Sequence, residues 1–182
     1  MRIISGSLGK RRLHPPKNMK LRPTTDQAKE GLFNILSNRY YFDELKVLDL
    51  FSGTGGISFE FISRGAISAT VVESNLIHFK FITSVKKEFE MDNLYPVKND
   101  VFKFLDYNTQ AFNLIFADPP FDLEELASIP DKIFAGKHLE ETGVFILEHP
   151  ANHDFSENEF FNETRRYGKV HFSFFSRKAK EE

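Results

Sequence analysis

Apolar residues along the chain follow two alternating patterns: short continuous runs, and segments in which they recur every three or four positions. The runs predict buried strands, and the helical spacing predicts amphipathic helices. Thr24 and Gln27 fit a capping box at the start of the first helix. Helices are expected from Thr24 to about Arg39, over the segment carrying Ile57, Phe61 and Ile62 up to Gly65, and from Leu76 to Phe89. Strands are expected at 47–51, 69–72, 96–98, 112–117 and 143–147.

The order of these segments predicts the fold class. Strands that alternate with helices are typical of a doubly wound α/β sheet with mostly parallel strands. Segment 112–117 is apolar throughout, as expected of a central parallel strand. Apolar and polar residues alternate after Gly168, so residues 163–176 are expected to form an antiparallel hairpin that turns at this glycine.

The first 22 residues are a basic segment that we expect to form a small β-ribbon. Ile3-Ile4 and Lys10–Leu13 flank a turn region, and Pro15-Pro16 ends the ribbon. Seven of the 24 Lys and Arg residues lie in this segment, and none of the 26 Asp and Glu residues does. We therefore divide the chain into a basic N-terminal ribbon, residues 1–22, and an acidic body, residues 23–182, and expect the ribbon to meet an anionic partner.

Composition excludes several kinds of chemistry. The chain has no cysteine, which excludes disulfides, thiolate metal sites, cysteine nucleophiles and cysteine-ligated iron–sulfur clusters. Its six histidines show no ligand-like spacing, so no metal is expected. No apolar run approaches 18 residues and no apolar signal segment is visible, so we expect a cytoplasmic protein without a membrane span. A monomer is the default expectation.

A glycine-containing segment, Asp49–Gly56, lies where the first strand of the body leads into a helix. Glycine lets the backbone approach a ligand closely, and a helix N-terminus offers unpaired N–H groups. A dinucleotide-binding fingerprint would require a glycine at position 58, where this chain has Ser58. The carboxylate of Asp49 would repel a pyrophosphate, but it suits a cationic ligand such as a sulfonium amino acid.

Two further acids follow the next strands. Glu73 ends the second strand, 20 residues after Gly53, where an acid can accept hydrogen bonds from ribose hydroxyls. Asp100 follows the third strand and could accept a hydrogen bond from an adenine amino group. Open α/β sheets bind ligands at the carboxyl ends of their strands. These acids together with Asp49 therefore predict an adenosine-containing cofactor.

The segment Asp118-Pro119-Pro120-Phe121 directly follows the fourth strand. Because proline lacks an N–H donor, the Asp118 carboxylate and the Pro119 carbonyl are expected to form a rigid pair of acceptors. Such a pair suits an amine with two hydrogens, and Phe121 offers a face on which a base can stack. Two acceptors can turn the delocalised lone pair of an exocyclic amine toward a sulfonium methyl group. Alignment for in-line attack, worth roughly 7–11 kcal/mol, must supply most of the acceleration.

These motifs resemble those of a known enzyme class. Asp49–Gly55, Glu73 and Asp118–Phe121 resemble the cofactor and acceptor motifs of class I S-adenosylmethionine-dependent methyltransferases. The cofactor motif comes first in those enzymes and the acceptor motif follows the fourth strand, as in this chain.

Within that class, the N-terminal part is similar to the RsmD family, which methylates guanine N2 in 16S ribosomal RNA. The similarity lies in Arg2–Gly6 through Arg11-Arg12-Leu13, and in Leu21–Asp26 with Leu32-Phe33-Asn34. It extends from residue 2 to about 150, and Arg22-Pro23-Thr24 is its most specific part.

The resemblance implies a Rossmann-like fold with a seven-stranded, mostly parallel sheet and an antiparallel C-terminal hairpin. It implies methyl transfer from S-adenosylmethionine to a guanine N2 amine, with ribosomal RNA or the small ribosomal subunit as partner. The expected catalytic residues are Asp118, Pro119 and Phe121. The expected cofactor-binding residues are Arg22, Thr24, Asp49, Phe51, Gly53, Gly55, Glu73, Ser74, Asp100, Val101 and Asp118. The expected RNA-binding residues are Lys10, Arg11, Arg12, Lys20 and Arg22.

Three alternatives stay open at this point. DNA methyltransferases acting on adenine N6 or cytosine N4, and protein-glutamine methyltransferases, can also use such an acceptor turn, although 182 residues leave little room for a DNA target-recognition region. A non-catalytic RNA-binding protein on a relic of the fold would have no reason to keep Asp118 and Phe121. A nicotinamide oxidoreductase is disfavoured by Ser58.

Overall fold

Seven strands form a single sheet, whose spatial order is β3-β2-β1-β4-β5-β7-β6. The computed structural model describes residues 1–17, 19 and 25–177. Strands β1 to β5 run parallel, and β7 lies antiparallel to both β5 and β6. This arrangement confirms the predicted fold class. The strands are β1 Lys46–Leu50, β2 Ser68–Glu73, β3 Leu94–Lys98, β4 Phe112–Ala117, β5 Leu139–His149, β6 Phe161–Tyr167 and β7 Val170–Phe175.

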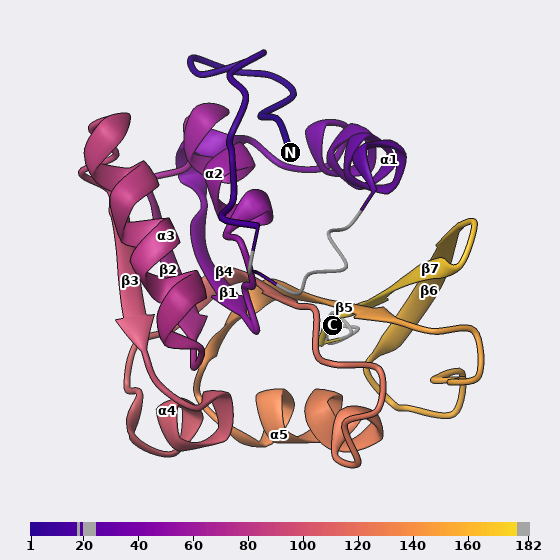
Figure 1. The fold of residues 1–182 in the computed structure, drawn as a ribbon. Coiled ribbons are helices and arrows are strands. Elements are labelled where there is room, and N and C mark those ends of the chain that lie inside the picture. The colour runs from indigo at the N-terminus through magenta and orange to yellow at the C-terminus, as the bar shows by residue number, and fades with distance from the viewer. Residues whose placement is uncertain (18, 20–24, 178–182) are drawn as a thin grey trace.

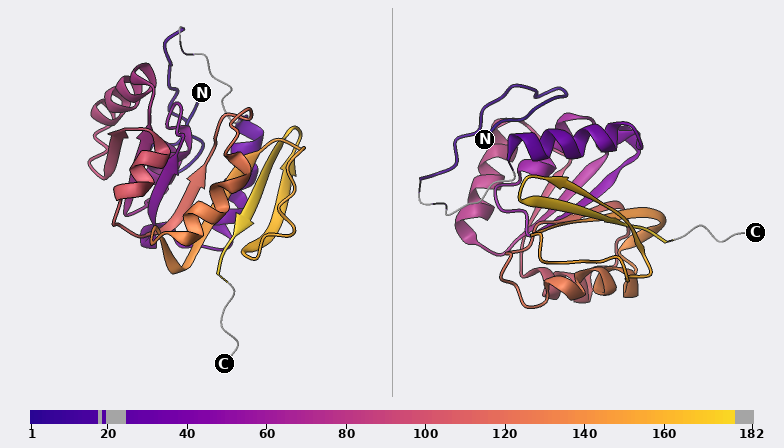
Figure 2. Two further views of the ribbon diagram at one scale, coloured as in Figure 1. Left: turned by 90° about the horizontal axis from the view of Figure 1, so that it is seen from below. Right: turned by 90° about the vertical axis from the view of Figure 1, so that its right-hand side faces the viewer.

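Helices cover both faces of the sheet, with α1, α2 and α3 on one face and α4 and α5 on the other (Figures 1 and 2). Each face has its own apolar core, one built around Phe33, Phe59 and Phe61 and the other around Phe104 and Phe134. Within the described part of the chain, no helix is long and apolar enough to cross a membrane. The helices are α1 Asp26–Ser37, α2 Gly56–Ser63, α3 Leu76–Glu88, α4 Val101–Tyr107 and α5 Ile129–Ala135, with 3-10 turns at Phe42–Glu44 and Leu126–Ser128.

The pattern of apolar residues missed α4 and α5, and it made β5 too short. Both helices have seven residues, which is too few for a clear helical repeat. Strand β5 begins four residues before Gly143. The apolar pattern missed this first part because residues 140–142 are exposed and polar. At α1, the hydroxyl of Thr25 accepts the Ala28 N–H at 3.2 Å, so the observed N-cap is Thr25. The expected cap, Thr24, lies outside the described residues.

The N-terminal ribbon takes the expected antiparallel form over a short length. Arg2 and Arg12 form an isolated antiparallel bridge. The Ile3 N–H donates to the Arg11 carbonyl at 2.9 Å, and the Leu13 N–H donates to the Met1 carbonyl at 3.0 Å. Ile3 and Leu13 are buried in the core that α1, α2 and α3 form, so the ribbon packs onto the body through its apolar side chains.

The buried side chain of Glu60 in α2 fastens this ribbon to the body. Its carboxylate accepts the backbone N–H groups of Ile4 at 2.7 Å and Ser5 at 3.0 Å, and it pairs with Arg64 at 2.8 Å. Gly6, at φ +83°, lies so close to α2 that a Cβ there would be 1.8 Å from the Ser63 carbonyl oxygen. A single carboxylate of α2 is therefore the hydrogen-bond acceptor for two backbone N–H groups of the ribbon.

Replacing Glu60 with Ala should destabilise the protein strongly, because it leaves the Ile4 and Ser5 N–H groups and the Arg64 guanidinium without their acceptor. Breaking a buried ion pair by removing one partner costs roughly 3–5 kcal/mol. Denaturant titration measures the free energy of unfolding, with the exposed Glu157→Ala variant as the control. Equal stability of the two variants would show that Glu60 does not hold the ribbon.

Candidate active site

Four acidic side chains lie at the carboxyl ends of neighbouring parallel strands. Asp49 lies in β1 and Glu73 ends β2. Ala117 of β4 pairs with Leu50 of β1 and with Leu147 of β5, so the next residues, Asp118 and Glu148, stand side by side. The Asp118 N–H donates to the Leu50 carbonyl at 3.3 Å, which ties the acceptor turn to the end of β1. The topology thus brings together the motifs that the sequence predicted to act jointly.

The glycine-containing segment makes a tight turn between β1 and α2. Gly53 and Gly55 have φ values of +55° and +74°, which glycine adopts without steric cost. Phe51 also has a positive φ of +57°, a conformation that costs a non-glycine residue of order 1–3 kcal/mol and occurs often at functional sites. The Thr54 hydroxyl lies 3.1 Å from the Met1 sulfur, so the start of the N-terminal ribbon touches this loop.

Asp49 is a buried carboxyl group with one oxygen unsatisfied. Its Oδ2 accepts the Ser58 hydroxyl at 2.6 Å, whereas Oδ1 has no hydrogen-bond partner among the described residues. Burial raises the pKa of Asp49 to about 7, with a smaller contribution from the charge of Glu73. A buried acceptor without a donor is costly, so the site fits a ligand that brings a positive charge or an N–H donor. Ser58, which had served only to exclude a dinucleotide motif, orients Asp49.

Backbone donors hold Glu73 in place. Its Oε2 accepts the Gly53 N–H at 2.8 Å, and its Oε1 accepts the Asn75 N–H at 2.7 Å. The His78 Nδ1 lies 3.6 Å from Oε2. Each carboxylate oxygen retains a second lone pair, so the orientation that these donors fix leaves capacity for the ribose hydroxyls that the sequence predicted.

The acceptor turn leaves β4 beside these acids. Asp118 and Phe121 are partly exposed, and Pro119 is buried. The Pro120 carbonyl accepts the Leu123 N–H at 3.0 Å, which closes the turn. Although Asp118 as a whole residue is partly exposed, its carboxyl group is enclosed by protein atoms, and this desolvation raises its pKa well above the usual range. The charges of Glu148 and Asp49 add to the effect. The turn therefore offers a carboxyl group of raised basicity three residues before the aromatic ring of Phe121.

Glu148 is the residue at this edge that sequence reasoning missed. It is only 3% exposed, and its charge acts on Asp118. A glutamate at the end of β5 stands in no sequence motif, because its neighbour at 118 belongs to a strand some 30 residues earlier. The signal that could have found it is an acid directly after an apolar run, the same signal that identified Glu73.

The other predicted cofactor residues lie around the same edge. Ser74 is exposed and follows Glu73, and Val101 is the buried first residue of α4. Asp100 is exposed and caps α4, where its Oδ1 accepts the Lys103 N–H at 3.1 Å. One carboxylate oxygen of Asp100 thus caps α4. The hydrogen bond from an adenine amino group to Asp100 stays a prediction. Three predicted residues lie outside the described part of the chain, namely Lys20, Arg22 and Thr24.

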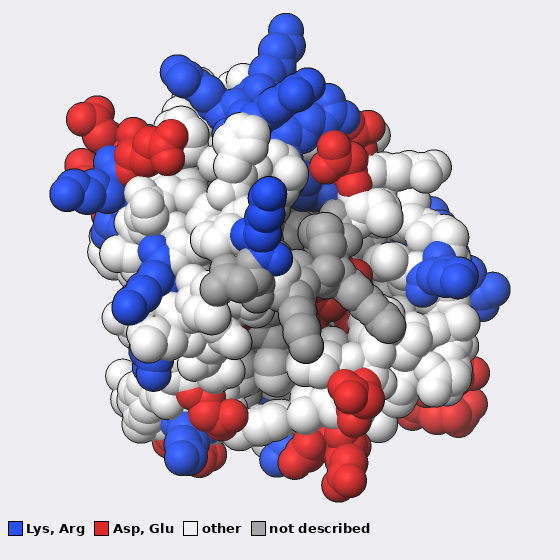
Figure 3. Space-filling view, viewed as in Figure 1, with Lys and Arg blue, Asp and Glu red and all other residues white. Residues whose placement is uncertain are grey.

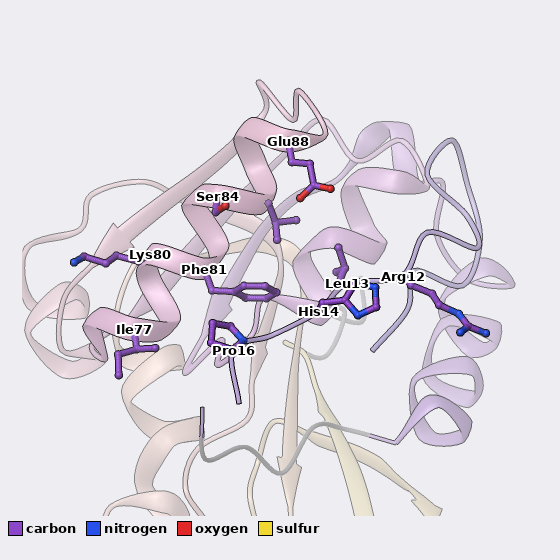
Figure 4. A pocket seen from close by; sticks show the side chains of 10 residues that line it. Arg12, Leu13, His14, Pro16, Ile77, Lys80, Phe81, Ser84 and Glu88 are labelled. Carbon is purple, nitrogen blue, oxygen red and sulfur yellow. The ribbon is translucent and has the colours of Figure 1, made fainter. Parts of the chain in front are cut away.

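The predicted RNA-binding residues Lys10, Arg11 and Arg12 are exposed on the ribbon. Basic side chains gather over the end of the molecule that carries the ribbon (Figure 3). A groove of about 500 Å³ separates the ribbon from α3, and the Phe81 ring projects into it from α3 (Figure 4). The groove is lined by Arg12, Leu13, His14, Pro16, Ile77, Lys80, Phe81, Ser84, Val85 and Glu88.

The fold and the comparison with solved structures define the class. The structure of yhhF from Escherichia coli superposes with a TM-score of 0.86, at 27% sequence identity over 99% of each chain. Solved structures with this arrangement include methyltransferases. The protein therefore has the class I methyltransferase fold, in which a parallel sheet ends in one antiparallel hairpin.

Sequence comparison defines the family. The profile described as conserved hypothetical protein 95 matches residues 1–176, and the chain belongs to this family. The Bacillus subtilis protein YlbH is 35% identical over 82% of each chain. The ribosomal RNA small subunit methyltransferase D of Buchnera aphidicola is 26% identical, over 96% of this chain and 91% of its own. The resemblance to the RsmD family is thereby confirmed.

Replacing Asp49 with Asn should remove a pH dependence from the stability of the free protein. The folded-state pKa of about 7 lies above the ordinary value of 3.8, so folding favours the protonated form. The contribution to stability is therefore complete below about pH 4 and is lost as the pH rises to about 7. A shift of this size corresponds to about 4 kcal/mol.

The measurement compares the thermal midpoints of the wild type and Asp49→Asn at pH 5 and pH 8, without ligand. The variant should gain stability relative to the wild type at the higher pH. An identical pH dependence in both proteins would mean that Asp49 does not titrate in this range.

Proposed function

We propose that this protein transfers a methyl group from S-adenosylmethionine to the exocyclic N2 amine of a guanine in small-subunit (16S) ribosomal RNA. The observation that carries the proposal is the position of Asp118 beside Asp49. The turn Asp118–Phe121 and a buried carboxylate oxygen that lacks a donor, Oδ1 of Asp49, stand at adjacent strand ends. An amine acceptor and a cationic methyl donor would meet there.

The names of relatives support the RNA substrate. Besides the Buchnera protein, the Escherichia coli protein that is 33% identical over 66% of this chain is named ribosomal RNA small subunit methyltransferase D. A protein that modifies ribosomal RNA works where ribosomes are assembled, and we place it in the cytoplasm. The exposed basic ribbon would supply the contacts to the RNA backbone, and we expect the protein to act as a monomer.

The cofactor would lie along the carboxyl ends of β1, β2 and β3. Asp49 would hold its positively charged part, Glu73 its ribose hydroxyls, and Asp100 its adenine amino group. The turn Phe51–Gly55 would let the backbone pass close to it. When bound, S-adenosylmethionine supplies an electrophilic methyl group. Arg22 and Thr24 would help to close this pocket, as the family resemblance implies.

The acceptor turn would prepare the amine for attack. The Asp118 carboxylate and the Pro119 carbonyl would each accept a hydrogen bond from one of its two N–H groups, and the Phe121 ring would stack on the base. Methylation makes the amine nitrogen acidic, and the carboxylate of Asp118 takes the proton that it releases. The raised pKa of Asp118 suits this second task, because a more basic carboxylate is a better proton acceptor.

The test uses total RNA and small ribosomal subunits from a strain that lacks the enzyme. Labelled S-adenosylmethionine and nucleoside digestion should yield N2-methylguanosine from small-subunit RNA. Asp118→Asn should lower the single-turnover rate by at least about 100-fold, since it removes both the anionic acceptor and the base. Activity should rise with pH as Asp118 ionises, because its carboxylate is the active form.

Phe121 provides a matched pair of variants for the same assay. Phe121→Ala removes the stacking face, worth about 1–3 kcal/mol per base, and should lose far more activity than Phe121→Tyr. Wild-type rates in Asp118→Asn, or label found only on adenine or on protein, would contradict the proposed function.

The basic ribbon should set the salt dependence of RNA binding. Replacing Lys10, Arg11 and Arg12 with Gln should flatten the slope of log affinity against log salt concentration by about 0.7–0.9 for each phosphate that the ribbon no longer neutralises. Cofactor binding should be nearly unchanged, because the charge of the ribbon lies apart from the acidic body. Base preference should also survive, because phosphate contacts position the RNA and do not choose the base.

The control removes the same number of charges from the β6–β7 hairpin, by replacing Arg165, Arg166 and Lys169 with Gln. These residues are exposed and lie at the far edge of the sheet. The control should keep the wild-type slope. If the hairpin variant flattened the slope and the ribbon variant did not, the RNA would bind across the hairpin.

A further inference from the structure

The groove between the N-terminal ribbon and α3 is an open cavity that the proposed chemistry does not use. Its volume of about 500 Å³ lies in the range of pockets that hold a small ligand. Because α3 starts directly after β2, the end of the groove at Ile77 and Lys80 lies nearer the carboxyl edge of the sheet, and Glu88 marks the other end. The groove therefore extends from the neighbourhood of the candidate active site along the surface of the molecule.

Apolar side chains line this groove, and several of them are open to solvent. Phe81 is partly exposed, and its ring projects from α3 into the groove (Figure 4). Ile77, one turn earlier in α3, is 41% exposed, and Pro16 on the facing segment is exposed as well. Contact of apolar surface with water is unfavourable. A flat apolar group seated against Phe81 would cover this surface.

Positive charge stands on both rims of the groove. Arg12 lies on the ribbon side and Lys80 on the α3 side (Figure 4). Both residues are exposed, and within the described part of the chain neither pairs with an acidic side chain. Glu88 is the acid among the described lining residues, and it lies at the end farther from the candidate active site. An anionic strand is therefore favoured near Lys80 and disfavoured near Glu88.

Unpaired RNA has both properties that such a groove fits. Proteins bind single strands by stacking the bases on aromatic rings and by neutralising the phosphates with Lys and Arg. We propose that the groove binds an unpaired nucleotide of the RNA substrate other than the reacting guanine, with its base stacked on Phe81 and the strand crossing between Lys80 and Arg12. This inference rests on the proposed function, because it takes the RNA substrate as the occupant.

The groove would select the state of the RNA rather than its sequence. Every base has a flat face, so stacking tolerates all four bases. A base inside a duplex has both faces covered by its neighbours and cannot stack on Phe81. The groove would therefore hold an open strand close to the site, which suits an enzyme whose target base must leave its stack to reach the acceptor turn.

Two RNAs of equal charge separate stacking from phosphate binding. One is a uridine oligonucleotide, and the other is an abasic oligonucleotide of the same length, which keeps the phosphates and lacks the bases. Uridine has no exocyclic amine, so it offers no donor pair to the acceptor turn. Fluorescence anisotropy measures the affinity of the full-length wild type and of Phe81→Leu for each RNA. Leucine keeps the apolar packing but removes the stacking face, so the preference for uridine RNA should fall by at least about fivefold.

Phe79→Leu is the matched control, because Phe79 is a partly buried residue of the same helix that does not line the groove. Phe81→Tyr keeps the ring. Both variants should keep the wild-type preference. The proposal would be wrong if Phe81→Leu kept it too, if Phe81→Leu weakened the binding of both RNAs equally, or if the wild type bound the two RNAs equally well.

Lys80→Gln tests the charge of the rim at an exposed position, where the replacement does not disturb the core. It should flatten the slope of log affinity against log salt concentration by about 0.7, the value for one phosphate of a single strand, and keep the preference for uridine RNA. Lys87→Gln, exposed on the same helix outside the groove, should keep the wild-type slope. A slope that Lys80→Gln leaves unchanged would place the strand outside the groove.

These measurements need no methyl transfer, so they fail independently of the proposed function. A wild type that prefers uridine RNA through Phe81 but does not methylate small-subunit RNA would refute the proposed function. A wild type that methylates small-subunit RNA, together with an unchanged preference in Phe81→Leu, would refute only the role of the groove.

Discussion

The burial of several carboxyl groups at one edge of a parallel sheet is the constraint on which this site depends. Parallel strands end at a common edge, and Asp49, Glu73, Asp118 and Glu148 all stand there. Burying a charge is costly unless donors surround it. The structure supplies donors to Glu73 from backbone N–H groups and to Asp49 from Ser58. The unsatisfied Oδ1 of Asp49 fits a ligand that is positively charged or carries N–H groups.

The division of labour at this edge follows from the strand order. The central position of β1 places Asp49 between β2 and β4, so one carboxylate borders both the strand end predicted to bind the cofactor and the strand end predicted to bind the methyl acceptor. The bond from the Asp118 N–H to the Leu50 carbonyl fixes the spacing between the two sides. A small movement of the loop Phe51–Gly55 would therefore alter both sides of the site. Two hydrogen bonds to β2 restrain this loop: the Ser52 N–H donates to the Val72 carbonyl, and the Gly53 N–H donates to Glu73.

Much of this arrangement could be predicted from the sequence, because the relevant signals are local. An acid within or directly after an apolar run, or a proline turn after one, singled out Asp49, Glu73 and Asp118 as candidate site residues. Glu148 also follows an apolar run, but nothing local singled it out, since its effect on Asp118 comes from the pairing of two strands that are distant in sequence. Asp100 was interpreted only as a ligand, and its role as the N-cap of α4 was missed because α4 is too short to show a periodic pattern. The anchoring of the ribbon by Glu60 likewise depends on contacts between distant parts of the chain.

The contact between Met1 and the glycine loop bears on how the protein is handled. The Met1 sulfur lies 3.1 Å from the Thr54 hydroxyl, and a Cβ added at Gly56 would lie 2.9 Å from it. A purification tag fused ahead of Met1 would start beside the turn that is expected to bind the cofactor, and it would also crowd the basic ribbon. Ligand-binding measurements on such a fusion would report on the tag as well as on the protein, so the affinity handle belongs at the other end of the chain.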